Sequence, residues 1–212
     1  MKKICVVTGT RAEYGLLKPL LCRIKEGKEA ELCLIVTGMH LSPEYGLTYR
    51  EIEQDGFLEY EKNEMLLSSD TANGVAKSMG LGGIGFADIY TRVSPHMVVL
   101  LGDRFETFAA ASAAMLQGIP IAHLHGGELT EGAVDDAMRH AITKMSALHF
   151  AAAPGYRKRI IQMGEMPENV YCVGAPGIEN LKAQKLMEKG ELEESIQFSL
   201  DKPFVIVTYH PV

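Results

Sequence analysis

The sequence lacks long apolar segments, an excess of positive charge and closely spaced cysteines. No segment approaches the roughly 20 apolar residues of a membrane-spanning helix, and the start, Met1 to Val7, contains no apolar stretch of signal-peptide length. A net charge of −6 argues against a general nucleic-acid-binding surface, which needs concentrated lysine and arginine, but it allows a small anionic ligand. We therefore expect a cytoplasmic protein that binds neither membranes nor nucleic acid.

The four cysteines, Cys5, Cys22, Cys33 and Cys172, form no CxxC pair. Three of them lie in apolar strand-like runs, and Cys22 lies in a helical pattern. A zinc site is not expected without close ligand spacing. A cytoplasmic location and apolar neighbours favour reduced, buried thiols.

A length of 212 residues with 47% apolar content suffices for one large α/β domain, or for one domain and part of another. Apolar strand-like runs occur at residues 4–7, 32–36, 98–101, 120–124, 148–152 and 170–173. Helical periodicity occurs between them, at residues 14–26, 72–92, 106–117, 134–146 and 156–163. This alternation predicts a doubly wound, parallel, Rossmann-like sheet. The polar stretch 41–64 gives no clear pattern.

The pattern changes after Val173. The run Gly-Ala-Pro-Gly at 174–177 breaks regular structure, residues 178–195 have the pattern of a charged helix, and residues 204–208 have that of an apolar strand. We expect a Rossmann-like domain over residues 1–175, a linker and helix over 176–202, and, over 203–212, the first strand of a second domain that is cut off. The alternative is an extra strand that closes the first sheet.

A glycine turn follows the first predicted strand, as Gly-Thr-Arg-Ala-Glu-Tyr-Gly at 9–15. Such a turn at a helix N-terminus exposes backbone N–H groups to an anion, and Arg11 can add a bidentate contact to a phosphate. The spacing matches neither the dinucleotide fingerprint GxGxxG nor a P-loop. The alternative for Arg11 is a solvated loop arginine.

Ionisable residues follow the strands that end near Leu101 and Leu124. Asp103 and Arg104 come after Gly102, at the carboxyl end of a buried strand, which is where a parallel sheet presents ligand-binding groups. The alternative for Asp103 is an N-cap of the next helix. These roles are compatible.

His123 and His125 share one face of a strand, a spacing that can chelate a metal, but no third ligand stands at a fixed spacing. We therefore expect no metal. Glu128, beyond a Gly-Gly turn, is better placed as an acid or base, because crowding with Asp103 and Asp136 would raise the pKa of one carboxyl.

One face of the helix at 134–146 carries Asp136, Arg139 and His140, which stand at i, i+3 and i+4. This face can be either a functional cluster or an ordinary helical salt bridge, and the sequence leaves both interpretations open. His140 by itself would fit a hydrogen-bonded core histidine.

Six ordered motifs now give a resemblance: the turn at 9–15, Val-Thr-Gly-Met-His at 36–40, Leu-Gly-Asp-Arg-Phe-Glu at 101–106, His-Gly-Gly-Glu at 125–128, residues 135–146 and His-Pro-Val at 210–212. Together they resemble the hydrolysing UDP-N-acetylglucosamine 2-epimerases of sialic-acid biosynthesis. The resemblance implies the N-terminal half of a GT-B fold, with the active site in the cleft between two Rossmann-like domains. It also implies that neither a nicotinamide nor a metal cofactor takes part.

The implied reaction converts UDP-N-acetylglucosamine and water to N-acetylmannosamine and UDP. A base removes the C2 proton, UDP leaves from C1 by anti elimination, and water adds to the resulting 2-acetamidoglucal. The resemblance gives phosphate contacts to Arg11, Ala12 and Arg104, and acid–base chemistry to Asp103, Glu128 and Asp136. It gives sugar binding or orientation to Arg139 and His140, and stabilisation of the leaving diphosphate to His210.

The sequence departs from the family pattern at His125, where many relatives carry Glu, so the identity of the base stays open. Without a second domain we expect the chain to bind UDP weakly and turn over little. The full-length protein is expected to be a homo-oligomer. A GT-B glycosyltransferase and a non-catalytic nucleotide-sugar-binding module remain as alternatives, and a bacillosamine derivative remains as an alternative sugar.

Overall fold

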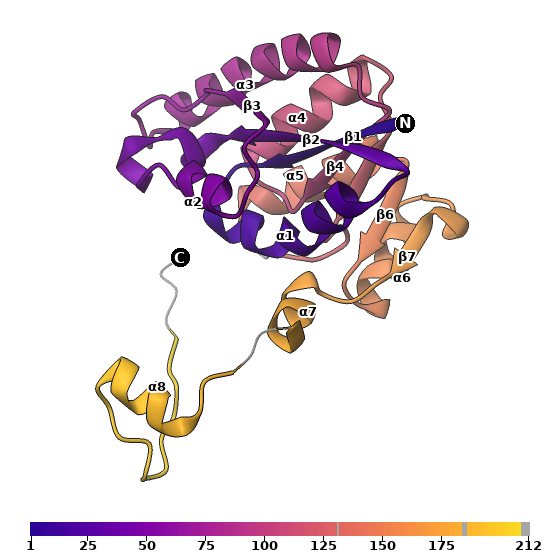
Figure 1. Cartoon of the computed structure of the whole chain (residues 1–212). Coiled ribbons are helices and arrows are strands. Elements are labelled where there is room, and N and C mark those ends of the chain that lie inside the picture. The colour runs from indigo at the N-terminus through magenta and orange to yellow at the C-terminus, as the bar shows by residue number, and fades with distance from the viewer. Residues whose placement is uncertain (131, 184–185, 209–212) are drawn as a thin grey trace.

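The computed structural model describes residues 1–130, 132–183 and 186–208, without the side chains at positions 179 and 183. Seven strands form one sheet in the order β3-β2-β1-β4-β5-β6-β7 (Figure 1). All the neighbouring strands in it are parallel. The strands are β1 (Lys2–Thr8), β2 (Ala30–Thr37), β3 (Tyr60–Asn63), β4 (Met97–Leu101), β5 (Ile121–Leu124), β6 (Leu148–Ala151) and β7 (Val170–Cys172). The predicted doubly wound parallel sheet is confirmed.

Six of the described helices connect the strands, and two follow the last strand, β7. They are α1 (Arg11–Glu26), α2 (Tyr49–Gln54), α3 (Ala72–Val93), α4 (Phe105–Leu116), α5 (Val134–Met145), α6 (Pro154–Gln162), α7 (Pro176–Ala183) and α8 (Lys189–Ile196). Short 3-10 turns lie at Gly38–Leu41, Pro43–Tyr45 and Pro167–Asn169. Within the described residues, no helix is both long enough and apolar enough to cross a bilayer.

The two faces of the sheet use alternate residues of each strand. Cys5 and Val7 of β1 belong to a core cluster with Phe86 of α3 and residues of α4 and α5. Val6, between them, belongs to the opposite cluster with Leu17 of α1. This alternation follows from the two-residue period of a strand, and burial on both faces explains why the strands are almost continuously apolar.

The strand order reverses between β1 and β4. The chain runs outward from β1 to β3 and then returns to place β4 on the other side of β1. In open α/β sheets, ligands bind outside the carboxyl ends of the strands at such a switch point. The turns after β1 and β4 carry Arg11 and Arg104, so two of the predicted binding residues flank this point.

The stretch 41–64, which gave no clear pattern, contains α2 and the edge strand β3. Strand β3 reads Tyr-Glu-Lys-Asn and buries only Asn63. An edge strand needs few buried side chains, so it lacks the apolar run that marks the central strands.

The C-terminal region differs from two expectations. The single helix predicted at 178–195 is wrong: α7 and α8 are separate, because α8 begins with its own capping box, in which the Glu188 N–H donates to the Glu191 carboxylate at 3.2 Å. Figure 1 shows α8 apart from the sheet. Helix α7 instead contacts α1, where Asn180 donates to the Gly15 carbonyl at 2.6 Å.

The strand predicted at 204–208 is not formed in the structure. Val205, Ile206 and Val207 are 86, 85 and 84% exposed, and no described strand pairs with them. The alternative of an extra strand in the first sheet is therefore wrong. An apolar segment without a neighbour gains nothing from an extended ladder, since its backbone groups would remain unpaired.

The cysteines are free, as predicted, but only Cys5 is fully buried. Cys22 and Cys33 are half-buried, and Cys172 is exposed at the end of the edge strand β7.

Gly127→Ala is expected to lower the free energy of unfolding by about 2–4 kcal/mol. Gly127 has φ +76°, and an added Cβ would lie 2.5 Å from the Tyr156 carbonyl oxygen. Gly118→Ala is the matched control, because Gly118 has φ +68° but open space around its Cα. The control should cost only about 1 kcal/mol, the strain of a left-handed backbone. Equal losses in urea unfolding of the two variants would show that the contact with Tyr156 does not matter.

Candidate functional site

The turn after β1 is held by a buried carboxylate. Glu13 accepts hydrogen bonds from the N–H groups of Gly9 and Thr10 at 2.8 and 3.2 Å, and the Thr10 hydroxyl accepts from the Glu13 N–H at 3.3 Å. This capping box makes α1 begin at Arg11, three residues before the predicted start. Burial raises the pKa of Glu13 to about 7, although Gly9 and Arg104 act in the opposite direction.

The sequence predicted that the backbone N–H groups of this turn would face an anion, but the capping box occupies those of Gly9 and Thr10. The N–H groups of Arg11 and Ala12, at the first two positions of the helix, have no intrahelical acceptor. Both residues are exposed. The Arg11 side chain is 72% exposed and its Nε lies 2.9 Å from Glu51 Oε2 of α2, so it forms a surface ion pair in this structure.

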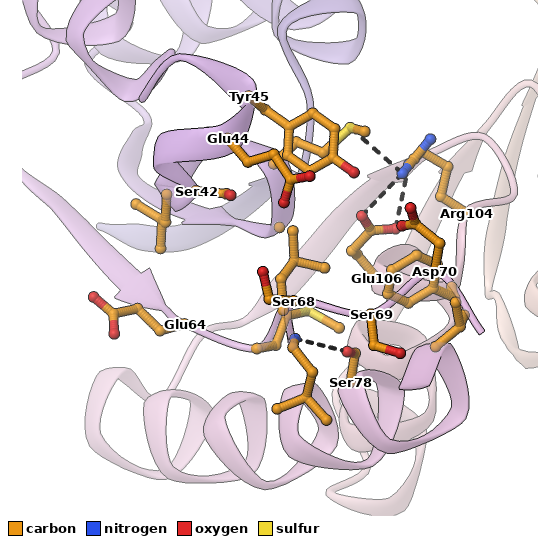
Figure 2. A pocket seen from close by; sticks show the side chains of 18 of the residues that line it. Ser42, Glu44, Tyr45, Glu64, Ser68, Ser69, Asp70, Ser78, Arg104 and Glu106 are labelled. Atoms are coloured by element: carbon orange, nitrogen blue, oxygen red, sulfur yellow. Dashed lines mark hydrogen bonds and ion pairs between the residues drawn. The ribbon is translucent and has the colours of Figure 1, made fainter. Parts of the chain in front are cut away.

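Arg104 is held by two carboxylates at the switch point. Its Nη2 lies 3.1 Å from Glu106 Oε1 and its Nε donates to Glu106 Oε2 at 3.2 Å (Figure 2). Glu13 Oε1 lies 3.9 Å from the same Nε. Glu106 is buried, and a Cβ on Gly38 would come within 2.9 Å of its Oε1. The guanidinium is therefore fixed at the mouth of the sheet by a bidentate ion pair.

A cavity of about 670 Å³ lies beside Arg104, between the 3-10 turns after β2 and the loop after β3 (Figure 2). Its polar lining includes Ser42, Tyr45, Ser68, Ser69, Asp70 and Arg104. Hydroxyl and carboxylate groups of this kind can hydrogen-bond a hydroxyl-rich ligand. Apart from Arg104, these residues carry no signal in the sequence, because they stand in the polar stretch 41–64 and in the loop that follows it.

Arg139 joins the ends of β4 and β5. Its Nη2 donates to Asp103 Oδ2 and, at 3.1 Å, to Thr130 Oγ1. Its Nη1 donates to the His125 carbonyl oxygen at 3.0 Å and lies 3.5 Å from Glu128 Oε2. Arg139 is buried, so the functional reading of its helix face is favoured over an exposed helical salt bridge.

The pKa values of Asp103 and Glu128 are shifted in opposite directions. Burial raises the pKa of Asp103, with Arg139 opposing and Asp135 adding to the rise. Burial also acts to raise the pKa of Glu128, but the hydrogen bond from His125 and the charge of Arg139 outweigh it and lower that pKa. The expected rise in the pKa of one carboxyl is found on Asp103, although burial is its largest cause and the neighbouring carboxylate that adds to it is Asp135.

Asp103 is not the N-cap of α4. That position belongs to Arg104, which makes no side-chain cap, so the proposed capping role of Asp103 is wrong. The chain turns at Gly102, with φ +80°, and this directs Asp103 towards Arg139 on α5 instead of along its own helix.

Asp136 and His140 stand at the edge of this cluster. Asp136 Oδ1 accepts a hydrogen bond from the Thr130 N–H at 3.0 Å, and Asp136 Oδ2 lies 3.8 Å from His140 Nε2. Thr130 thus connects Asp136 to Arg139. His210 lies outside the described residues.

His123 holds the turn at Gly102 that precedes Asp103. It is fully buried, its Nε2 lies 2.8 Å from the Gly102 carbonyl oxygen, and its Nδ1 lies 3.2 Å from Thr143 Oγ1. Burial lowers the pKa of His123 to about 4, so the ring is neutral at pH 7. Both of its nitrogens already have hydrogen-bond partners, so its geometry is that of a structural residue. Among the described side chains, no group of three or more His, Cys, Asp or Glu is arranged to hold a metal.

Three site residues were missed at the level of sequence. Glu13 carries a signal, because Thr-x-x-Glu ahead of a helix is a capping box. Glu106 stands in the first turn of α4, where an acidic residue is common without a binding role, and Thr130 carries no signal, since its partner Arg139 comes from α5.

Curated relatives match the chain along its entire length. A GDP/UDP-N,N'-diacetylbacillosamine 2-epimerase (hydrolyzing) from Campylobacter jejuni is 44% identical over 211 residues, which are 100% of this chain and 55% of the relative. A UDP-N,N'-diacetylbacillosamine 2-epimerase (hydrolyzing) from Legionella pneumophila is 40% identical over 212 residues, again 100% of this chain and 56% of the relative. The chain therefore spans about half the length of these relatives.

Solved structures share the fold. The UDP-N-acetylglucosamine 2-epimerase from Neisseria meningitidis, bound to UDP-N-acetylglucosamine, has a TM-score of 0.77 and 20% identity, over 94% of this chain and 54% of that chain. These neighbours have the GT-B fold, of which this chain corresponds to the N-terminal half. The sequence model of the UDP-N-acetylglucosamine 2-epimerase family matches residues 22–212. With a match over most of its length, the chain belongs to this family of epimerases.

Proposed function

We propose that the full-length protein is a hydrolysing UDP-sugar 2-epimerase and that residues 1–175 form its N-terminal domain. The observation that carries the proposal is Arg139, a buried arginine that holds Asp103 and Glu128 together at the carboxyl ends of β4 and β5. Carboxylates beside a switch point that also carries Arg104 fit a reaction in which a proton moves and a diphosphate leaves. Residues 176–202 would link this domain to a second one that begins near residue 203.

The proposed chemistry has two stages. A base takes the C2 proton of the sugar while UDP departs from C1, and water then adds to the 2-acetamidoglucal to release the 2-epimer. Asp103, Glu128 and Asp136 supply the acid–base environment, and Arg139 and His140 position them or bind the sugar. Arg11, Ala12 and Arg104 receive the diphosphate, and His210 assists its departure. No cofactor is required by this scheme.

The sugar is a UDP-linked 2-acetamido sugar. Two relatives at 40–44% identity are named for N,N'-diacetylbacillosamine, and an Escherichia coli relative at 41% identity is named polysialic acid biosynthesis protein P7. These names favour two substrates, the UDP derivatives of N,N'-diacetylbacillosamine and N-acetylglucosamine. We further propose a cytoplasmic, homo-oligomeric full-length protein.

Incubation of the full-length protein with each UDP-sugar in deuterated water tests this function. We expect release of UDP and of the 2-epimer with deuterium at C2, because elimination breaks the C2–H bond. Release of the sugar without C2 deuterium would support a glycosyltransferase-type transfer instead. UDP-sugar binding without any release would support the non-catalytic binding module.

Arg11→Lys is expected to weaken UDP binding to the full-length protein about tenfold, because lysine cannot form the bidentate contact with a phosphate. The ligand must draw the guanidinium away from Glu51, its present partner. Arg92→Lys is the matched control, since Arg92 forms a similar exposed ion pair with Glu61 at the end of α3. Calorimetric titration with UDP measures both. An unchanged affinity of Arg11→Lys for UDP would mean that Arg11 is a solvated residue that does not contact the phosphate.

A further inference from the structure

His125 and Glu128 form a closed pair at the end of β5. His125 Nδ1 lies 2.7 Å from Glu128 Oε1, and Glu128 Oε2 lies 3.5 Å from Arg139 Nη1. Both oxygens of Glu128 are therefore engaged by donors. A carboxylate in this state is a weak proton acceptor, which agrees with its lowered pKa, to which His125 and Arg139 both contribute.

The pair fixes the tautomer of the histidine. With the Nδ1–H donating to Glu128, the lone pair of the neutral ring lies on Nε2. Among the described residues Nε2 has no hydrogen-bond partner, and it is buried. A buried ring nitrogen without a partner calls for an explanation, and a catalytic role is one that fits this position. The side chain as a whole keeps 19% of its surface exposed, so part of the residue reaches solvent although Nε2 itself does not.

The backbone holds this ring in an uncommon position. His125 has φ +63°, in the left-handed region that non-glycine residues seldom adopt. Two hydrogen bonds enforce it: the His125 N–H donates to the Phe150 carbonyl at 3.1 Å, and the His125 carbonyl accepts from Arg139 Nη1 at 3.0 Å. Such strained residues cluster at active sites, where the surrounding structure maintains them.

We propose that His125, oriented by Glu128, is the base that removes the C2 proton of the UDP-sugar. This inference rests on the proposed function. Glu128 would then be a positioning residue, which fixes the ring and stabilises the imidazolium, as the carboxylate does in a Ser-His-Asp triad. Asp103 and Asp136 remain for the other proton transfers.

The step balances as an elimination. Nε2 of His125 forms a bond to the C2 proton, the electron pair of the C2–H bond becomes the C1–C2 double bond, and the C1–O bond breaks with its pair leaving on UDP. Water then adds its oxygen to C1, and an acid on the opposite face adds a proton to C2 and regains one from that water. The proton on His125 passes to solvent and is the proton that the hydrolysis releases.

Two variants and their combination test the pair in the full-length protein. His125→Asn keeps a donor near the position of Nδ1 and tolerates a left-handed backbone, but it has no basic nitrogen. Glu128→Gln keeps an acceptor for the ring and loses the charge. We expect kcat to fall by roughly 10²- to 10⁴-fold in His125→Asn and by roughly 10²-fold in Glu128→Gln, with KM for the UDP-sugar changed by less than about fivefold.

The double variant separates a pair from two independent groups. If Glu128 acts through His125, the double variant should be no slower than His125→Asn, because effects within one unit are not additive. Multiplied losses would overturn the pair. His96→Asn is the matched control, since His96 is exposed and precedes β4 at the opposite end of the strand, and it should leave kcat unchanged.

The activity of the wild-type protein separates failure of the proposed function from failure of the assignment of the base to His125. If the wild type releases no UDP from either UDP-sugar, the proposed function fails. If it does, and His125→Asn keeps its rate within tenfold, only the assignment of the base to His125 is overturned. Should His125→Asn fail to fold, Glu128→Gln, whose side chain has the same shape, decides the same question: unchanged kcat would contradict the pair.

Discussion

Replacing Asp103 by Asn in the full-length protein is expected to lower kcat about 10²-fold or more, the usual scale of acid–base catalysis. Asp103 lies after the central strand β4, is paired with the buried Arg139, and has a pKa raised by burial. Asn has the same shape but can neither carry the charge nor transfer a proton. Steady-state kinetics with the UDP-sugar measure the loss, and circular dichroism checks the fold.

The matched control is Asp88→Asn on the exposed surface of α3, which should leave kcat unchanged. Because the N-cap of α4 is Arg104, loss of helix capping cannot explain a slow Asp103→Asn variant. Near-normal turnover of Asp103→Asn would mean that Asp103 only neutralises Arg139.

Arg139→Lys is expected to lower kcat at least about 10²-fold and the free energy of unfolding by about 2–4 kcal/mol. The guanidinium contacts Asp103, Glu128, Thr130 and the carbonyl of His125 together. A lysine ammonium is a point charge without the planar fork, so it cannot serve four acceptors at once. At least one buried carboxylate would then lose its partner.

Arg157→Lys is the matched control for the structural part of this loss. Arg157 donates to the backbone carbonyls of Val170 and Pro167 at 2.9 and 3.1 Å, outside the site. We expect it to destabilise the protein in urea unfolding without changing kcat. If Arg139→Lys also kept its kcat, Arg139 would be a purely structural residue.

The sequence predicted best those elements whose burial is visible in the local pattern of apolar and polar residues. The central strands β1, β2, β4 and β5 are apolar on both faces, and α3, α4 and α5 show clear periodicity between them. The edge strand β3 was missed because its residues are mostly polar, and β-structure there depends on pairing with β2.

The predicted strand at 204–208 shows the opposite failure. Its apolar residues satisfy the local pattern of a strand, but a strand also needs a neighbour to accept its backbone hydrogen bonds, and none lies beside it in the described structure. Local pattern and tertiary context must agree before an element forms.

The sequence by itself determined which residues reach the functional edge. In a parallel sheet the carboxyl ends of all strands meet on one side, so Asp103 after β4 and Glu128 after β5 had to lie near each other. Only the tertiary structure decided how these charges are paired. It placed Arg139 between them, gave Arg104 to the buried Glu106, and set the ring of His125 against Glu128. Only the Arg139 pairing joins side chains from distant segments, but all three depend on burial, because a charge in the protein interior must find whichever partner the packing brings within reach.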